Sequence, residues 1–244
     1  ALLKHEPDWL INCAAYTAVD KAESDKAAAT AINATAAGAI ANACAANGVR
    51  LAQISTDFVF DGAQSTPYLP DDEPNPLCVY GATKLAGEQL VARALPDALI
   101  IRTSWLYSAH GHNFVKNMLN LMQSREELGI VYDQVGSPTW AATLAHAIWQ
   151  LITLGASGIY HCSDNGVASW YDFTVAIQEE ALAAGLLRKT IPVRPIRTEQ
   201  FQTPARRPTY SVLDKQQTES LLGVTFPHWR KSLRHMLSEL AEIP

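Results

Sequence analysis

The amino-acid sequence predicts an α/β fold: a doubly wound parallel sheet with helices on both faces and a smaller C-terminal lobe. Three observations predict it. Short apolar runs alternate with helical patterns, an order typical of β-α-β units. Polar or aromatic residues follow several of these runs directly, as they do at the ligand-binding edge of a parallel sheet. After residue 169 this alternation stops, which indicates a second, different lobe.

The N-terminal part contains two apolar runs with a helix between them. Residues 9–15 and 49–54 have the composition of buried strands. Residues 25–47 are dominated by Ala, which favours a helix, and Gly48 supplies a left-handed helix end. Asn33 is polar within this Ala-rich pattern, and both a local hydrogen bond and a role in ordering active-site water remain open.

The middle of the chain continues the alternation. Each further element is predicted from apolar periodicity and from the residues that begin or end it. The predicted elements are a helix at 80–94, a strand at 98–102, a helix at 112–125, a strand at 129–132, a helix at 139–153 capped by Thr139, and a strand at 158–162.

The last part of the chain lacks the β-α-β alternation. Ser169 can cap a helix over 170–184, a Pro- and Arg-rich extended stretch covers 191–214, and helical patterns follow at 215–222 and 229–241. We therefore predict a smaller substrate lobe that closes over the sheet. The predicted division is a core of 1–110 and 126–165 and a lobe of 111–125 and 166–244.

Composition excludes several classes of protein. A net charge of −5 with scattered signs argues against a nucleic-acid-binding surface. No apolar run approaches the roughly 18 residues of a membrane span, and no signal-peptide pattern is present. The four widely spaced cysteines are typical of buried thiols in a reducing compartment. We expect a cytoplasmic protein without nucleic-acid or membrane partners.

Tyr80 and Lys84 are candidate catalytic residues. Residues four apart on a helix share a face, with Cβ atoms about 6 Å apart. A neighbouring ammonium lowers the pKa of a phenol from about 10, which would make Tyr80 a general acid toward a carbonyl oxygen. Because this spacing also occurs by chance on surface helices, the pair needs support from other residues.

Residues at the ends of three predicted strands give that support. Ser55, Thr56 and Asp57 follow the second strand, residues 14–17 follow the first, and residues 103–105 follow the third. The carboxyl ends of parallel strands meet at one edge of the sheet. Turn capping would explain any one of these groups but less easily all three, so we predict a site at this edge.

Six motifs together identify a family resemblance: INCAAYTAVDKAE, STDFVFDG, YGATKLAGE, IIRTSWLY, DQVGSPT and ARRPTYSVLD. The chain resembles the dTDP-4-dehydrorhamnose reductases, which are extended short-chain dehydrogenases/reductases, over essentially its whole length. The resemblance implies a Rossmann-like fold and reduction of the C4 ketone of dTDP-4-dehydro-L-rhamnose by NADPH or NADH. It also suggests a homodimer.

The resemblance implies roles for individual residues. Tyr80 would donate the proton to the C4 oxygen, Lys84 would lower its pKa and hold the nicotinamide ribose, and Thr56 would support the phenol. Thr56 and Asp57 would contact the sugar. Ala15, Tyr16 and Thr17 would lie against the cofactor, and Trp105 would contact the sugar nucleotide. Asn113 would stand at the mouth of the substrate lobe, with Phe114 and Lys116.

Arg206 and Arg207 are candidates for the diphosphate, because a guanidinium matches phosphate oxygens geometrically. For both arginines a solvent-facing or structural role is equally open. Some relatives hold magnesium with acidic residues at a subunit interface, where this chain has Ala142, so we predict no metal.

The chain departs from the family pattern in one respect. It contains no G-x-G-x-x-G or G-x-x-G-x-x-G motif, whose backbone amides normally receive the cofactor pyrophosphate. We expect a fragment that lacks the first β-α-β unit and does not by itself bind cofactor tightly. A family member that has lost cofactor binding is the alternative.

Two other functions are compatible with this fold. An epimerase or dehydratase is one, but a dehydratase typically carries an acid pair after the Thr, and here Thr56 is followed by Asp57 and Phe58. A non-catalytic regulatory subunit is the other. Such a subunit has no need of Thr56, Tyr80 and Lys84, which favours the reductase.

Overall fold

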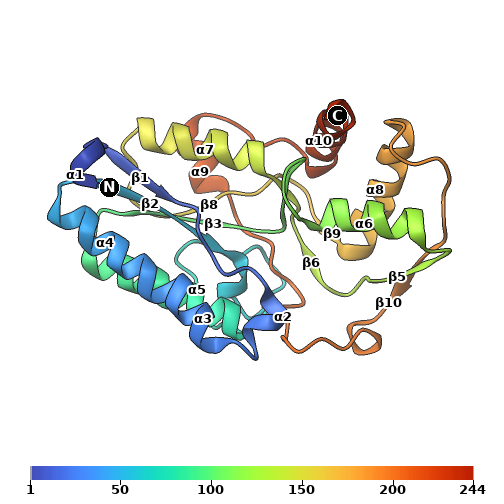
Figure 1. The fold of residues 1–244 in the computed structure, drawn as a ribbon, viewed down its shortest axis with the longest axis horizontal. Helices are drawn as coiled ribbons and strands as arrows, with labels where there is room; N and C mark the ends of the chain where they lie inside the picture. The colour runs from blue at the N-terminus through green and yellow to red at the C-terminus, as the bar shows by residue number, and fades with distance from the viewer. Residues whose placement is uncertain (1, 244) are drawn as a thin grey trace. The chain divides into compact units, whose positions relative to one another are not determined.

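The computed structural model describes residues 2–243 and contains two compact units, each with its own core (Figure 1). Ala1 and Pro244, the outer ends of the predicted domains, lie outside the described residues. The first unit consists of Ala1–Thr103, Ala147–Cys162 and Thr203–Gly223, and the second of Ser104–His146, Ser163–Gln202 and Val224–Pro244.

The first unit is built on a four-stranded parallel sheet in the order β1-β2-β3-β8. Its strands are β1 (Trp9–Asn12), β2 (Arg50–Thr56), β3 (Leu99–Thr103) and β8 (Gly158–His161). All five residues of β3 are buried, as expected of an inner strand covered on both faces. The predicted parallel α/β fold is confirmed.

The Ala-rich segment forms three consecutive helical pieces instead of one regular helix. They are α3 (Lys26–Thr30), a π-helical turn η1 (Ala31–Ala36) and α4 (Ala37–Ala46). They pack against α5 (Val79–Ala94). At Gly87 of α5 an added Cβ would lie 2.1 Å from the Asn33 carbonyl oxygen, so only glycine allows this approach.

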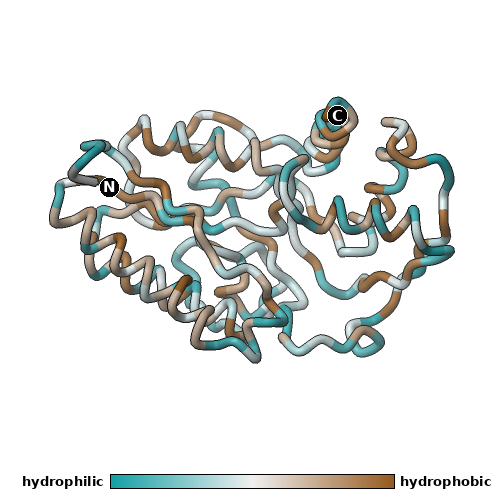
Figure 2. Tube along the Cα trace, in the orientation of Figure 1, coloured by the Kyte–Doolittle hydropathy of each residue, from teal (hydrophilic) through white to brown (hydrophobic). Residues whose placement is uncertain are grey.

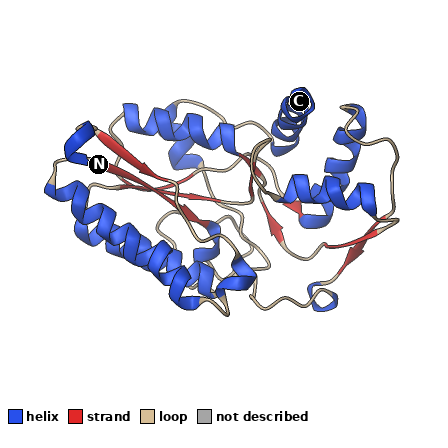
Figure 3. Cartoon of the chain, in the orientation of Figure 1, coloured by secondary structure: helices blue, strands red, loops and turns tan. Residues whose placement is uncertain are grey.

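The second unit contains mostly helices and three pairs of short strands (Figure 3). Its helices α6 (Phe114–Ser124), α8 (Trp170–Ala183) and α10 (Trp229–Glu242) share an apolar core. Figure 2 shows the alternation of hydrophobic and hydrophilic residues along α6. The strand pairs are β4 (Leu106–Tyr107) with β7 (Thr139–Trp140), β5 (Leu128–Val131) with β10 (Val193–Ile196), and β6 (Val135–Gly136) with β9 (Ala168–Ser169).

The remaining elements are short helical segments and the longer helix α7. They are α1 (Leu2–His5), α2 (Val19–Ala22), η2 (Asp57–Val59), α7 (Ala141–Thr153), η3 (Thr198–Gln200) and α9 (Gln216–Leu222). No helix among the described residues is long and apolar enough to cross a membrane.

The two predicted helix caps had different outcomes. Ser169 caps α8 as predicted, and the structure adds Asp172, which returns the interaction in a complete capping box. The prediction for Thr139 was wrong, because Thr139 belongs to β7 and its amide donates to the Trp105 carbonyl at 3.2 Å.

The units differ from the predicted division at residues 104–110, 126–146, 163–165 and 203–223, and backbone pairing explains all but the short segment 163–165. The extended segment 203–223 belongs to the first unit, because Tyr68 exchanges backbone hydrogen bonds of 2.8 Å with Val212 and Asp214. Residues 104–110 and 126–146 belong to the second unit, where β4, β5 and β7 find their partner strands.

A buried ion pair between Glu88 and Arg102 joins α5 to β3, and its loss should destabilise the fold. Glu88 and Arg102 are 4% and 2% exposed and form two hydrogen bonds of 2.8 and 3.0 Å. Because Glu88→Gln would leave a buried guanidinium without its counter-charge, it should lower the free energy of unfolding by about 3–5 kcal/mol in urea titration. Glu127→Gln in the exposed Glu127–Arg194 pair is the control and should change it by less than about 1 kcal/mol. Equal effects would contradict this account.

Candidate functional site

The candidate site lies where β2 ends and α5 begins. Thr56 is the last residue of β2, and Tyr80 is the second residue of α5. An added Cβ at Gly81 would lie 2.1 Å from the Phe58 carbonyl oxygen, so the first turn of α5 touches the backbone that follows β2. The Phe58 and Tyr80 rings meet edge to face at 5.6 Å. This close approach brings Tyr80 to Thr56.

Tyr80 is a protonated phenol at neutral pH. Burial raises its pKa to about 12, a hydrogen bond with Thr56 opposes this, and the negative charge of Asp57 adds to it. The predicted lowering of the Tyr80 pKa is wrong: the pKa is raised, chiefly by burial, and Lys84 is not among the groups that shift it. A raised pKa keeps the proton on the phenol oxygen at neutral pH, although a general acid works best with a pKa near the working pH.

Lys84 also belongs to α5, and it is buried, with 4% of its surface exposed. Its Nζ donates to the Ile54 carbonyl at 2.5 Å and so ties α5 to β2. Burial lowers the pKa of Lys84 to about 8, and the neighbouring Glu88 opposes that shift. An ammonium has three donors, so the bond to Ile54 leaves two for a ligand.

Thr56 and Asp57 form a small hydrogen-bonded unit. The Thr56 hydroxyl donates to Asp57 Oδ1 at 3.1 Å and accepts from the Phe58 amide at 3.2 Å. Burial raises the pKa of Asp57 to about 6, against the opposing effects of the Ser211 and Thr56 hydroxyls. The direction of the Thr56 hydroxyl is therefore set by its neighbours before any ligand binds.

Asn33 links the segment after β1 to α5. Its side chain accepts from the Tyr16 amide at 2.8 Å and donates to the Tyr16 carbonyl and to Thr83 Oγ1, both at 3.1 Å. Thr83 in turn donates to the Tyr80 carbonyl at 2.9 Å. Asn33 is buried and its partners are distant in sequence, so it is neither exposed nor bonded locally, and a role in ordering active-site water stays a prediction. Thr83 was missed by sequence reasoning, because nothing marks it there beyond its place between Tyr80 and Lys84.

The predicted cofactor-contacting residues Ala15, Tyr16 and Thr17 follow the carboxyl end of β1. Ala15 and Tyr16 are half-buried and Thr17 is exposed, and the Tyr16 hydroxyl donates to Asp25 at 3.2 Å. Asn33 fixes their backbone, as described above. Their contact with a cofactor stays a prediction.

The two candidate arginines have different environments. Arg207 forms hydrogen bonds of 3.0 and 2.8 Å to the two carboxylate oxygens of Asp20 and one of 2.7 Å to Thr203 Oγ1. It therefore fastens the segment after residue 202 to α2. Arg206 is exposed, which leaves its guanidinium accessible to an anion.

Trp105 and Asn113 belong to the second unit. Asn113 is the N-cap of α6, where its Oδ1 accepts from the Lys116 amide at 3.2 Å and its Nδ2 donates to the Ser108 carbonyl at 2.6 Å. Both ends of this amide are thus used locally. Trp105 is half-buried and has a φ of +46°. Their contacts with substrate stay predictions.

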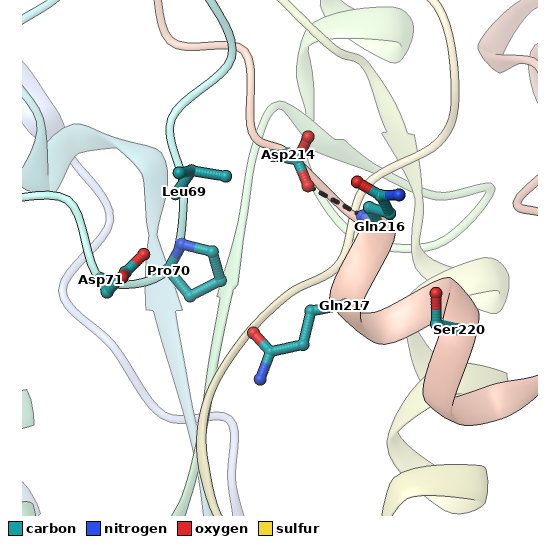
Figure 4. Close-up of a pocket in the computed structure, with 7 residues that line it drawn as sticks. All are labelled: Leu69, Pro70, Asp71, Asp214, Gln216, Gln217 and Ser220. Carbon is teal, nitrogen blue, oxygen red and sulfur yellow. Dashed lines mark hydrogen bonds between the residues drawn. The ribbon is translucent and has the colours of Figure 1, made fainter.

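A separate hollow of about 320 Å³ lies on the first unit (Figure 4). It is lined by Leu69, Pro70, Asp71, Asp214, Gln216, Gln217 and Ser220. None of these is a predicted site residue. The part of the chain that the structure describes contains no cluster of three or more His, Cys, Asp or Glu residues arranged to hold a metal ion.

The fold and the site together define the class of protein. A parallel α/β sheet carries a Tyr–Lys pair at the start of one helix and a Thr hydroxyl at the carboxyl end of the neighbouring strand. This is the arrangement of a Rossmann-like oxidoreductase that protonates an oxygen beside a hydride donor.

Comparison with known proteins identifies the family. Residues 1–242 match the family model described as RmlD substrate binding domain. The chain is 40% identical over 242 residues to the dTDP-4-dehydrorhamnose reductase of Shigella flexneri, covering 97% of this chain and 81% of that protein. The chain therefore belongs to the RmlD substrate binding domain family, and the resemblance inferred from its motifs is confirmed.

Solved structures agree with this assignment. A dTDP-4-dehydrorhamnose reductase from Clostridium acetobutylicum has a TM-score of 0.91 and 41% identity, covering 98% of this chain and 83% of that one. The enzyme of the same name from Bacillus anthracis, in complex with NADP, has a TM-score of 0.92 and 39% identity with the same coverage. The Rossmann-like fold of this chain is thus shared with these reductases.

The raised pKa of Asp57 predicts a pH dependence of stability. Its folded pKa of about 6 lies above the ordinary value of 3.8, so the folded state binds the proton more tightly than the unfolded chain does. The contribution of Asp57 to the free energy of unfolding should therefore fall by roughly 2–3 kcal/mol as pH rises from about 4 to about 6.

Urea titrations across this pH range would measure the effect. Asp57→Asn, which cannot ionise, should remove this part of the pH dependence, whereas Asp71→Asn at an exposed position should leave it unchanged. A parallel pH dependence in wild type and Asp57→Asn would contradict the raised pKa.

Proposed function

We propose that this protein reduces the C4 ketone of dTDP-4-dehydro-L-rhamnose to give dTDP-L-rhamnose, with NADPH or NADH as the hydride donor. One observation carries the proposal: Tyr80, Lys84 and Thr56 converge at the carboxyl edge of β2 in a chain that is 40% identical to reductases named for this reaction.

The residues present fit the nicotinamide end of such a cofactor. Lys84 keeps two ammonium donors beside the carboxyl edge of the sheet, and Asn33 fixes the backbone of Tyr16, which follows β1, through two hydrogen bonds. Lys84, Ala15, Tyr16 and Thr17 would hold this part of the cofactor. When bound, the cofactor supplies the hydride for the C4 carbon. A glycine-rich turn for its pyrophosphate is not among the residues of this chain.

Tyr80 supplies the proton. Its raised pKa keeps the phenol neutral, so the proton passes to the C4 oxygen as negative charge develops there during reduction. Thr56 holds the phenol through a hydrogen bond.

The substrate is held by other residues. On the family resemblance, Trp105 contacts the sugar nucleotide and Arg206 pairs with its diphosphate. Arg207 is less suited to this role because Asp20 already occupies its guanidinium. We assign cofactor binding to the first unit and sugar recognition chiefly to the second. From the family resemblance we also infer a cytoplasmic homodimer, and the net charge of −5 argues against a nucleic-acid partner.

The alternatives are less well supported. A dehydratase would need a second acid after Asp57, but that position is Phe58, whose ring packs on Tyr80 at 5.6 Å. A regulatory subunit would have no use for a buried Lys84 and a protonated Tyr80 at a strand end, since burying an ionisable group costs stability.

The proposal predicts turnover that depends on the Tyr80 hydroxyl. The natural protein, with any residues that flank this chain, should oxidise NADPH or NADH when given dTDP-4-dehydro-L-rhamnose. Tyr80→Phe should lower kcat by about 10²- to 10⁴-fold, the usual worth of a general acid. Substrate affinity should change by no more than about 1.5 kcal/mol, the value of one hydrogen bond.

Tyr132→Phe, at an exposed tyrosine of the second unit, is the matched control and should leave kcat unchanged. Cofactor oxidation, followed by absorbance at varied substrate concentration, gives kcat and KM. No turnover by the wild type would refute the proposed function, and full activity in Tyr80→Phe would remove Tyr80 from the acid role.

A further inference from the structure

Trp105 has a strained backbone. Its φ of +46° lies in the left-handed region, where a bulky side chain crowds its own backbone. Such strain persists only where the surroundings enforce it, and it is found most often at functional sites. The contacts that hold Trp105 therefore indicate the function of its side chain.

The backbone on both sides of Trp105 is fixed to one segment, residues 136–140 of the second unit. Ser104 Oγ donates to the Ser137 carbonyl at 2.7 Å, and the Thr139 amide donates to the Trp105 carbonyl at 3.2 Å. The next two residues, Leu106 and Tyr107, pair with Thr139 and Trp140 as β4 and β7. The G-S-P-T half of the DQVGSPT motif thus anchors the strained residue.

Gly136 of this segment makes room for the indole. An added Cβ there would lie 2.7 Å from Trp105 Cε2 and 2.8 Å from Nε1, closer than real Cβ atoms come. The φ of Gly136 is not in the left-handed region, so its backbone does not require glycine. What requires glycine here is the position of the Trp105 ring.

Trp170 covers one face of the same ring. The two indoles are stacked with centroids 3.4 Å apart and planes 3° from parallel. Trp170 is the first residue of α8, whose start is fixed by the Ser169–Asp172 capping box, and Phe114 packs on it at 4.5 Å. The stacking partner is therefore itself rigidly placed.

Core packing does not account for this arrangement. Tyr107, Phe173 and Trp229 are buried in the core of the second unit, whereas Trp105 and Trp170 pack against that core but stay half-buried. A strained backbone is not needed to bury a ring that stays partly exposed. It is needed to present an aromatic surface in a fixed direction, as recognition of a ring-containing ligand requires.

We propose that Gly136 and Trp170 are positioning residues that hold the Trp105 indole in the orientation in which it contacts the sugar nucleotide. The contact between Trp105 and substrate rests on the proposed function. The positioning of Trp105 by Gly136 and Trp170 does not, and it can be measured without any ligand.

The ligand-free test uses the far-ultraviolet circular-dichroism couplet that two closely stacked indoles produce. Trp105→Ala and Trp170→Ala should each abolish the couplet, and Gly136→Ala should weaken it by displacing the Trp105 ring. Trp149→Ala removes an exposed indole, and Gly129→Ala adds a methyl that meets only the Ile196 side chain at 3.3 Å. Both controls should keep the couplet. An unchanged couplet in Gly136→Ala or Trp170→Ala would overturn the proposal.

The second test separates positioning from folding. Trp170→Ala should raise KM for dTDP-4-dehydro-L-rhamnose about three- to tenfold, the worth of one aromatic pair, with kcat changed less than about twofold. Trp170→Phe keeps a stacking ring and should restore KM. The double variant Trp105→Ala/Trp170→Ala should be no worse than Trp105→Ala alone, because Trp170 acts through Trp105.

Additive effects on KM in the double variant would overturn the proposal, as would a fall in kcat with KM unchanged. If the wild-type protein does not turn over this substrate, the proposed function fails. The dichroism comparison then still decides whether Gly136 and Trp170 hold Trp105.

Discussion

Helix α5 touches the backbone of two neighbouring segments at its glycines, and the site depends on this contact. An added Cβ at Gly81 would lie 2.1 Å from the Phe58 carbonyl oxygen, and one at Gly87 would lie 2.1 Å from that of Asn33. Tyr80 directly precedes Gly81, and Lys84 lies between Gly81 and Gly87 on the same helix. Larger residues at Gly81 and Gly87 would force α5 away from these two segments. Tyr80 would then lose its hydrogen bond with Thr56.

This close packing also buries three charged side chains beside α5. Lys84, Glu88 and Arg102 are all buried, and each has a partner: Lys84 donates to the Ile54 carbonyl, and Glu88 pairs with Arg102. Buried charges persist only when such bonds offset their lost hydration. The same burial removes water from the Tyr80 phenol and raises its pKa, so one packing arrangement places the acid and keeps it protonated.

Sequence reasoning predicted the parts that follow from periodicity and spacing. It placed the parallel strands, the helix that carries Tyr80 and Lys84, and the Ser169 cap, because each leaves a local signal. It did not predict the π-helical turn at Asn33 or the pKa of Tyr80. Both depend on contacts between segments distant in the chain: Gly87 against Asn33 in the first case, and burial beneath Phe58 in the second. The role of Gly136 was missed for the same reason, since its neighbour Trp105 lies 31 residues away in sequence.

The raised pKa of Tyr80 bears on its proton transfer. A phenol with a pKa of about 12 gives up its proton only to an oxygen that becomes strongly basic, which an alkoxide formed by hydride addition is. The phenolate left behind lies near Asp57, whose negative charge disfavours it and so favours its prompt reprotonation. The surroundings of Tyr80 therefore keep its phenol protonated in the ligand-free protein.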